Sequence, residues 1–217
     1  MKDIEILLAS NSPRRRQLLS WTGLKYRVCP LNINEDILQG EQADDYVLRL
    51  AGEKARAAKR FVKSGEVILA ADTIVVDNGE ILGKPKDDLD AYRMLSQLRG
   101  REHYVSTAVA LLDPMNEVLL VDKCTSPVRM RNYSDEEINS YVDSKDPFDK
   151  AGGYAIQHAD FQPVERFQDC FASVMGFPLC HFVRMMKKMG FNLPADVPNN
   201  CQTQLEYVCP VFDRILA

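Results

Sequence analysis

A basic segment near the N-terminus is the first candidate for ligand chemistry: it reads Ser10-Asn11-Ser12-Pro13-Arg14-Arg15-Arg16. Ser12 and Pro13 are typical of the cap and the first position of a helix. A helix N-terminus presents unpaired N–H groups and a partial positive charge, and arginine can bind phosphate oxygens bidentately. Arginines in a first turn oppose the helix dipole unless an anion lies there. The segment therefore predicts either a phosphate site involving Ser10, Arg14 and Arg15, or a solvated basic turn.

Two ionisable residues interrupt apolar patterns further along the chain. Lys54 shares the apolar face of a helix expected over residues 44–62, so its ammonium must snorkel, pair or reach a ligand. Asp72, followed by Thr73, lies within the apolar strand expected over residues 67–76. A carboxylate there is costly unless it is paired or bound to a metal. We favour a functional role for Asp72 over a strand-end aspartate that only bonds a neighbouring loop.

Two glycine-containing loops add polar groups. The segment Gly83-Lys84-Pro85 predicts a tight loop from which Lys84 can reach a phosphate, although a surface lysine is the commoner outcome. In the segment from Asp149 to Gln157, paired glycines allow close backbone approach, and Gln157 can both donate and accept hydrogen bonds. That capacity suits the edge of a nucleobase, and the alternative is a plain turn into a strand.

Other site chemistries find little support in the sequence. No G-x-x-x-x-G-K-[ST] pattern occurs, which argues against a P-loop enzyme. The histidines are isolated from one another and from any nucleophile, so we expect structural or surface roles for all of them: His103, His158 and His181. The six cysteines include no C-x-x-C pair and are expected to be free thiols.

Composition limits the class of protein. The chain has 217 residues, enough for one domain or two small lobes on a shared sheet, and its formal charge is −4. A mildly acidic chain is a poor candidate for non-specific nucleic-acid binding. No apolar run is long enough to span a bilayer, and the first residues lack a signal-peptide pattern. We therefore expect a cytoplasmic protein with no membrane association.

The elements that must position these residues alternate between strand and helix. Strands are expected over residues 4–9, 24–30, 67–76, 80–82, 102–112 and 117–129, with further short strands after residue 153. Helices are expected from Pro13 to before Gly23, over 44–62 and 88–98, from a capping box at Ser134, and over 179–188. The pattern predicts an α/β fold with a mixed sheet, because 102–129 resembles an antiparallel pair. Residues 191–217 are expected to form a tail.

Taken in order, these segments resemble the Maf family of nucleotide pyrophosphatases over residues 8–188. The matching blocks are Leu8 to Arg15, Tyr46 to Ala55, Ala71 to Val75, Gly83 to Pro85, Asp149 to Gln157 and Gly176 to Leu179. The resemblance implies an elongated Maf- and Ham1-like α/β fold, with a mixed sheet flanked by helices and two lobes around a deep nucleotide-binding cleft. It places the family domain at residues 1–190 and gives the tail at 191–217 no role.

The resemblance also implies a reaction: metal-dependent hydrolysis of a nucleoside triphosphate to a monophosphate and pyrophosphate. Asp72 matches the family's general base, and Glu35 matches an acidic position that helps Asp72 to hold the metal, expected to be Mg²⁺ with Mn²⁺ as the alternative. The polar and basic positions of the triphosphate cleft match Ser10, Arg15, Lys54 and Lys84. A homodimer is compatible with the resemblance.

Three positions indicate a subfamily. Arg14, Thr73 and Gln157 take the form found in members that resemble dTTP and UTP pyrophosphatases, whereas the 7-methyl-GTP type differs at all three. His158 departs from the small turn that is common beside Gln157, which puts the shape of the base pocket in question. Two other functions stay open: a nucleotide-binding regulator of cell division without turnover, and a house-cleaning enzyme for modified nucleotides.

Overall fold

A six-stranded mixed sheet forms the framework of the protein in a computed structural model that describes residues 4–217. The strands are β1 (Glu5–Leu8), β2 (Lys25–Val28), β3 (Glu66–Asp77), β4 (Glu80–Leu82), β5 (Glu102–Asp113) and β6 (Val118–Arg129). Their order is β2-β1-β3-β5-β6, with β4 beside β3. β1 runs parallel to β2 and β3, whereas β5 lies between β3 and β6 and runs antiparallel to both. The α/β mixed sheet expected from the sequence is therefore confirmed.

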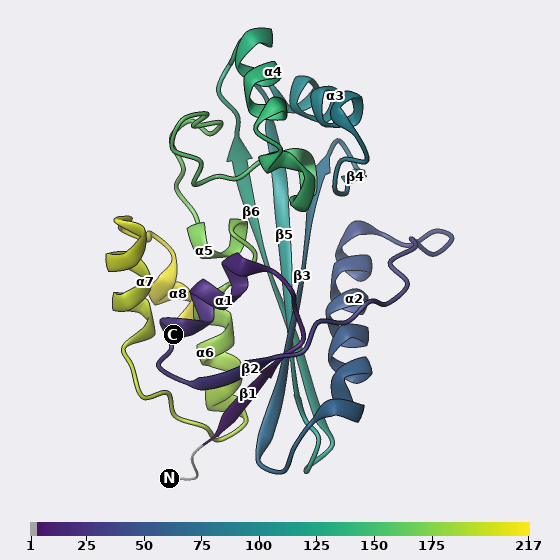
Figure 1. Cartoon of the computed structure of the whole chain (residues 1–217). Coiled ribbons are helices and arrows are strands. Elements are labelled where there is room, and N and C mark those ends of the chain that lie inside the picture. Colours follow the sequence, from purple (N-terminus) through teal and green to yellow (C-terminus); the bar gives the residue numbers. More distant parts are fainter. Residues whose placement is uncertain (1–3) are drawn as a thin grey trace.

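Helices cover both faces of the sheet (Figure 1). They are α1 (Pro13–Ser20), α2 (Ala43–Ala58), α3 (Asp88–Leu98), α4 (Asp135–Asp143), α5 (Phe171–Val174), α6 (Leu179–Lys188), α7 (Val197–Leu205) and α8 (Phe212–Leu216). Short 3₁₀ turns occur at Lys59–Phe61, Asp146–Asp149 and Ala151–Gly153. None of the helices within residues 4–217 combines the length and hydrophobicity that a bilayer-spanning helix needs.

The core divides into three clusters that define two lobes. In the lower lobe, α2 packs on one face of the sheet around Val47 and Leu50, while α1 and α6 cover the other face. In the upper lobe, α3 and α4 enclose the third cluster around Tyr133 and Phe161. β3 contributes to all three clusters, through Ile68, Leu69 and Val75 among others, because its side chains alternate between faces along its twelve residues. The two lobes therefore share one continuous sheet.

Most element boundaries agree with the sequence expectations. β5 and β6 form the antiparallel pair expected over residues 102–129, with Glu102 opposite Arg129 and Asp113 opposite Val118. The capping box is also confirmed: Ser134 Oγ accepts from the N–H of Glu137, whose carboxylate in turn accepts from the N–H of Ser134.

The short strands expected after residue 153 are wrong. Apart from one isolated bridge between Met130 and Val164, the segment is irregular. Its backbone groups bond to side chains and carbonyls: the N–H of Ala155 donates to Tyr141 Oη, and Arg131 donates to the carbonyl of Phe161. Side-chain partners therefore replace a strand ladder here. The helix over 179–188 is present but is followed by α7 and α8, which lie within the segment expected to be a tail.

Candidate active site

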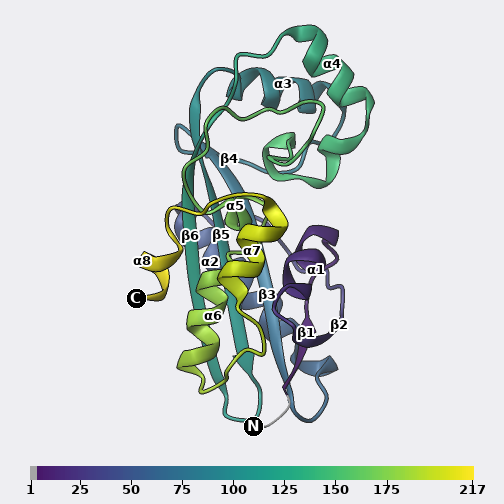
Figure 2. The ribbon, with the colours of Figure 1, turned by 90° about the vertical axis from the view of Figure 1, so that its left-hand side faces the viewer.

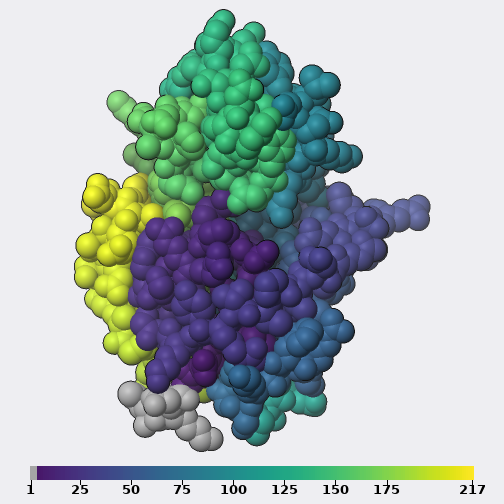
Figure 3. Space-filling view, viewed as in Figure 1, coloured from purple at the N-terminus to yellow at the C-terminus, as the bar shows by residue number. Residues whose placement is uncertain are grey.

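A cavity of about 260 Å³ opens between the two lobes. In the space-filling view the surface is hollowed where the upper lobe meets the N-terminal part of the chain (Figure 3). The sequence-predicted residues on its wall are Arg14, Arg15, Glu35, Lys54, Asp72, Thr73, Lys84 and Gln157. Ser10 is not on this wall. Six separate segments of the sequence thus meet at one cavity.

Lys54 lies between two carboxylates. Its Nζ is 2.6 Å from Glu35 Oε1 and also forms an ion pair with Asp72 Oδ1. The Lys54 and Asp72 side chains are each 11% exposed, so neither charge reaches bulk water freely. Lys54 therefore pairs instead of snorkelling, which decides between the alternatives that its helix position left open.

Glu35 comes from the segment between β2 and α2, which carries little regular structure. Tyr46, on α2, holds that segment in place because its hydroxyl donates to the carbonyl of Glu35 at 2.7 Å. Burial raises the pKa of Glu35, but its hydrogen bond with Lys54 and the charges of Lys54, Lys84 and Arg15 outweigh burial and hold this pKa below its usual value. Burial, reinforced by the charges of Asp72 and Glu35, raises the pKa of Tyr46. Glu35 is therefore held as a carboxylate within a cationic environment.

Arg15 is fixed by three hydrogen bonds from its guanidinium. Nε donates to the carbonyl of Gly176 at 2.8 Å, Nη2 to Thr73 Oγ1 at 3.0 Å and Nη1 to Ser10 Oγ at 3.3 Å. Ser10 thus lies behind Arg15 and orients it. Thr73 Oγ1 also lies 3.0 Å from Thr107 Oγ1, so the hydroxyl that receives Arg15 is itself held. Burial lowers the pKa of Arg15, and the negative charge of Asp72 opposes this effect.

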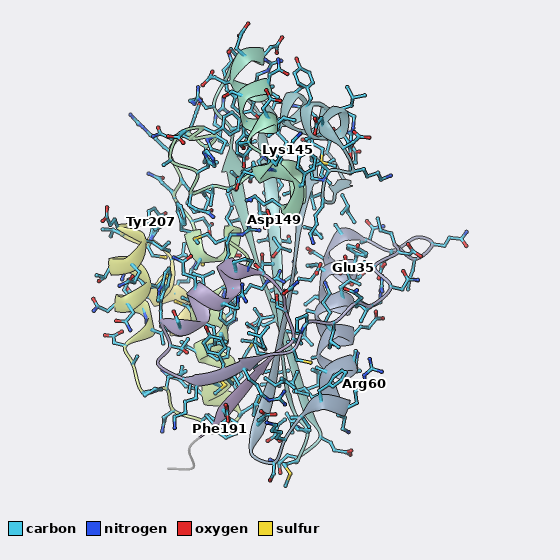
Figure 4. All side chains as sticks on the ribbon, in the orientation of Figure 1. Glu35, Arg60, Lys145, Asp149, Phe191 and Tyr207 are labelled. Atoms are coloured by element: carbon cyan, nitrogen blue, oxygen red, sulfur yellow. The ribbon has the colours of Figure 1, made fainter. Side chains whose placement is uncertain are left out.

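At the start of α1, arginine side chains oppose the helix dipole, as the sequence predicts. Ser12 caps the helix, Pro13 occupies its first turn and no acidic residue lies in that turn. Arg14 Nη1 finds a partner across the cleft, 3.4 Å from Asp149 Oδ2. Figure 4 shows Asp149 at the lower border of the upper lobe and Glu35 on the lower lobe beside α2. This pair joins the two lobes, but its length and exposure leave Arg14 available to an anion.

The paired glycines bring two loops together. The N–H of Gly152 donates to the carbonyl of Gly83 at 2.9 Å, beside Lys84. Gly152 has φ +68°, and a Cβ there would lie 2.9 Å from Val75 Cγ2, so no side chain fits. The two loops that carry Lys84 and Gln157 are therefore fixed to each other and to β3.

Lys84 and Gln157 are exposed residues on the cavity wall. Within residues 4–217, neither side chain makes a hydrogen bond, so both terminal groups are available to a ligand. His158 is not on the wall: its Nδ1 accepts from the N–H of Phe161 at 3.0 Å, and its ring packs edge-on against Tyr141. The histidine beside Gln157 thus leaves the cavity unobstructed.

Sequence reasoning did not single out several wall residues, among them Tyr46, Tyr154, Met175 and Gly176. Tyr154 is held by a hydrogen bond of 2.7 Å between its hydroxyl and His103 Nε2. Burial lowers the pKa of His103 to about 4, so the ring is neutral at pH 7. The expected structural role of His103 is consistent with these contacts. The local signals near Tyr154 were the Gly152-Gly153 pair and Gln157.

The cavity combines carboxylates, several cations and an exposed amide on an α/β sheet, which is chemistry suited to a phosphorylated ligand. The family model for "Maf-like protein" matches residues 5–189. The chain belongs to the Maf family.

Individual relatives agree with that membership. A protein named "dTTP/UTP pyrophosphatase" from Geobacter sp. (strain M21) is 45% identical over 190 residues, which cover 88% of this chain and 98% of that protein. A protein of the same name from Caldicellulosiruptor bescii is 40% identical, over 87% of this chain and 96% of that one. Among solved structures, protein VC0702 from Vibrio cholerae has a TM-score of 0.42 and 10% identity, covering 84% of this chain and 97% of that one, too little to inform function.

Proposed function

We propose that this protein hydrolyses nucleoside triphosphates, with dTTP and UTP preferred, to the monophosphate and pyrophosphate. The observation that carries the proposal is the ion pair between Asp72 and Lys54, which lies in one cavity with Arg15 and Lys84. The proposal is supported by the family membership and by relatives at 40–45% identity whose names give this activity. A site that only bound anions would gain nothing from a buried carboxylate.

In the proposed reaction, water attacks the α-phosphorus and the bond to the bridging oxygen of the β-phosphate breaks. Asp72 orients this water and accepts its proton. Lys54, Lys84 and Arg15 stabilise the negative charge that moves onto the leaving pyrophosphate. In the free protein Lys54 pairs with both Glu35 and Asp72, and we infer that it turns toward the phosphates when the substrate enters.

The donor set fits a divalent cation that is completed by substrate. Glu35 and Asp72 share one ammonium, so their oxygens converge on the same part of the cavity. No group of three or more His, Cys, Asp or Glu side chains within residues 4–217 is arranged to hold a metal by itself. Mg²⁺ commonly takes one or two carboxylates together with phosphate oxygens and waters. Mg²⁺, or Mn²⁺ in its place, held by Glu35 and Asp72 would neutralise charge on the triphosphate.

We assign base selection to the rim of the cavity. Gln157 offers two donors and an acceptor, which match the carbonyl and N–H edge that thymine and uracil share. Arg14 lies at the opposite lobe, in reach of the phosphates or sugar. Thr73 acts indirectly, because its hydroxyl is occupied by Arg15 and Thr107.

The test is a panel of dTTP, UTP, CTP, ATP, GTP and 7-methyl-GTP with Mg²⁺ or Mn²⁺, in which pyrophosphate and orthophosphate are measured separately. We expect pyrophosphate as the first product and the highest kcat/KM for dTTP and UTP. Orthophosphate as the first product would overturn the cleavage position. A preference for a guanine nucleotide would overturn the base assignment, and tight binding without turnover would favour a regulator.

A further inference from the structure

The last 28 residues, 190–217, lie beyond the family match, which ends at residue 189. We call them the C-terminal extension. The Geobacter relative aligns over 98% of its own length without reaching the full length of this chain. The extension is nevertheless part of the packed structure: Val197, Val211 and Ile215 are buried in the same cluster as α1 and α6. Figure 2 shows α7 standing beside α6 on this face.

Tyr207 joins the extension to the segment that precedes the cavity wall. Its hydroxyl lies 3.0 Å from the carbonyl of Asp169 and 3.3 Å from that of Phe167, and donates to this pair. Its ring packs against Phe167 and Phe171, with centroid distances of 6.0 and 5.4 Å. Figure 4 shows Tyr207 at the end of α7 nearest α5. The backbone N–H of Tyr207 donates to the carbonyl of Gln202 at 3.1 Å.

The segment held by Tyr207 leads directly to Arg15. Phe171 begins α5, and Met175 and Gly176 follow it onto the cavity wall. The N–H of Met175 donates to the carbonyl of Phe171 at 3.0 Å, so the turn that ends at Gly176 is built on the residue that Tyr207 contacts. The carbonyl of Gly176 accepts Nε of Arg15 at 2.8 Å. A displacement of this turn would therefore move an acceptor of the catalytic-site arginine.

A second contact reaches the helix that carries Arg15. Asn200 Nδ2, on α7, donates at 2.9 Å to the carbonyl of Trp21, the C-cap residue that follows α1. Pro194 packs against Gly23, whose added Cβ would lie 3.1 Å from Pro194 Cγ. The extension thus contacts both the helix that supplies Arg15 and the turn that receives its guanidinium.

We propose that the C-terminal extension positions Arg15 for phosphate binding, with Tyr207 as a positioning residue that acts through Phe171 and Gly176. The inference rests on the proposed function for its kinetic readout. It makes residues 190–217 part of the working site of this chain, although they lie outside the part that matches the family.

The experiment compares Tyr207→Phe, which removes only the hydroxyl, with Val208→Ala as a matched control. Val208 is 86% exposed and adjoins Tyr207 without lining the cavity. In Tyr207→Phe we expect KM for dTTP to rise about three- to tenfold, because about one neutral hydrogen bond is lost, with kcat nearly unchanged. The thermal midpoint should fall by only about 2–4 °C, since one hydrogen bond is lost while the ring and its packing remain. Val208→Ala should leave both constants unchanged.

A double-mutant cycle with Arg15→Lys tests the route. If Tyr207 acts through Arg15, its hydroxyl matters less once the guanidinium is gone, so the two effects on kcat/KM are not additive. Additive effects, or a Tyr207→Phe variant with the KM of wild type, would overturn the proposal. Hydrogen exchange at the amides of residues 173–177 provides a readout independent of turnover. Faster exchange there in Tyr207→Phe is expected, and unchanged exchange would refute the positioning role even if dTTP proved not to be the substrate.

Discussion

Replacing Asp72 with asparagine tests the centre of the proposed site. The substitution keeps the shape of the side chain and removes one negative charge from the group of Asp72, Glu35 and Lys54. The contact of 2.6 Å between Lys54 and Glu35 remains, so the ammonium keeps a charged partner. We therefore expect Asp72→Asn to fold, because no buried charge is left without a partner. Loss of a general base should lower kcat by about 10²–10⁴, which corresponds to about 3–5 kcal/mol in activation free energy.

The assay measures pyrophosphate release from dTTP under saturating substrate, together with the thermal midpoint and the dissociation constant for a non-hydrolysable dTTP analogue. Asp160→Asn makes the same chemical change at an exposed position outside the cavity, and it should match wild type in all three. A folded Asp72→Asn variant whose kcat stays within tenfold of wild type would remove Asp72 from the role of base. A variant that unfolds would show instead that Asp72 is required for stability.

Three further predictions concern individual side chains. Lys84→Met should lower kcat/KM about 10- to 150-fold through loss of a charge-assisted phosphate contact, whereas Lys86→Met, on the same loop but off the cavity wall, should not. Gln157→Glu should reduce the preference for dTTP over GTP, measured as a ratio of kcat/KM values, because it loses both donors. His103 has a folded pKa of about 4, below its usual 6.5, so the unfolded chain binds a proton that the folded one does not as pH falls through this interval. The wild type should therefore lose up to about 3 kcal/mol of its free energy of unfolding through His103 as pH falls from 6.5 to 4. His103→Gln should lack this loss, and urea unfolding at the two pH values measures the difference.

The elements of the fold were largely predictable from local patterns. Caps such as Ser12 and the Ser134–Glu137 box specify helix starts within a few residues, and apolar runs specify β3, β5 and β6. The irregular segment after residue 153 was not predictable, because its partners are Tyr141 and Arg131, which are distant in sequence. Strand formation there depends on tertiary contacts that a local pattern does not contain.

The site was predictable residue by residue but not as an arrangement. The apolar surroundings of Asp72 and Lys54 marked both, yet nothing in their 18-residue separation says that they pair. Glu35 required the family resemblance, because its segment has no periodic pattern. Ser10 was expected to bind substrate, whereas it contacts Arg15 from behind. The fold decides which polar side chains face the cavity and which lie behind them. Residue type alone therefore cannot separate the groups that touch a ligand from those that orient them.

The three twelve-residue strands that enter both lobes have a mechanical consequence. A strand of this length extends about 40 Å, and β3, β5 and β6 are hydrogen-bonded side by side along most of it. A continuous hydrogen-bonded sheet of this length resists bending. It therefore opposes the hinge closure that occurs in proteins whose lobes are joined by flexible connections. Adjustment to a ligand is left to loops and side chains at the rim. We therefore expect the separation of the two lobes to be nearly the same in the free protein and in its complex with a ligand.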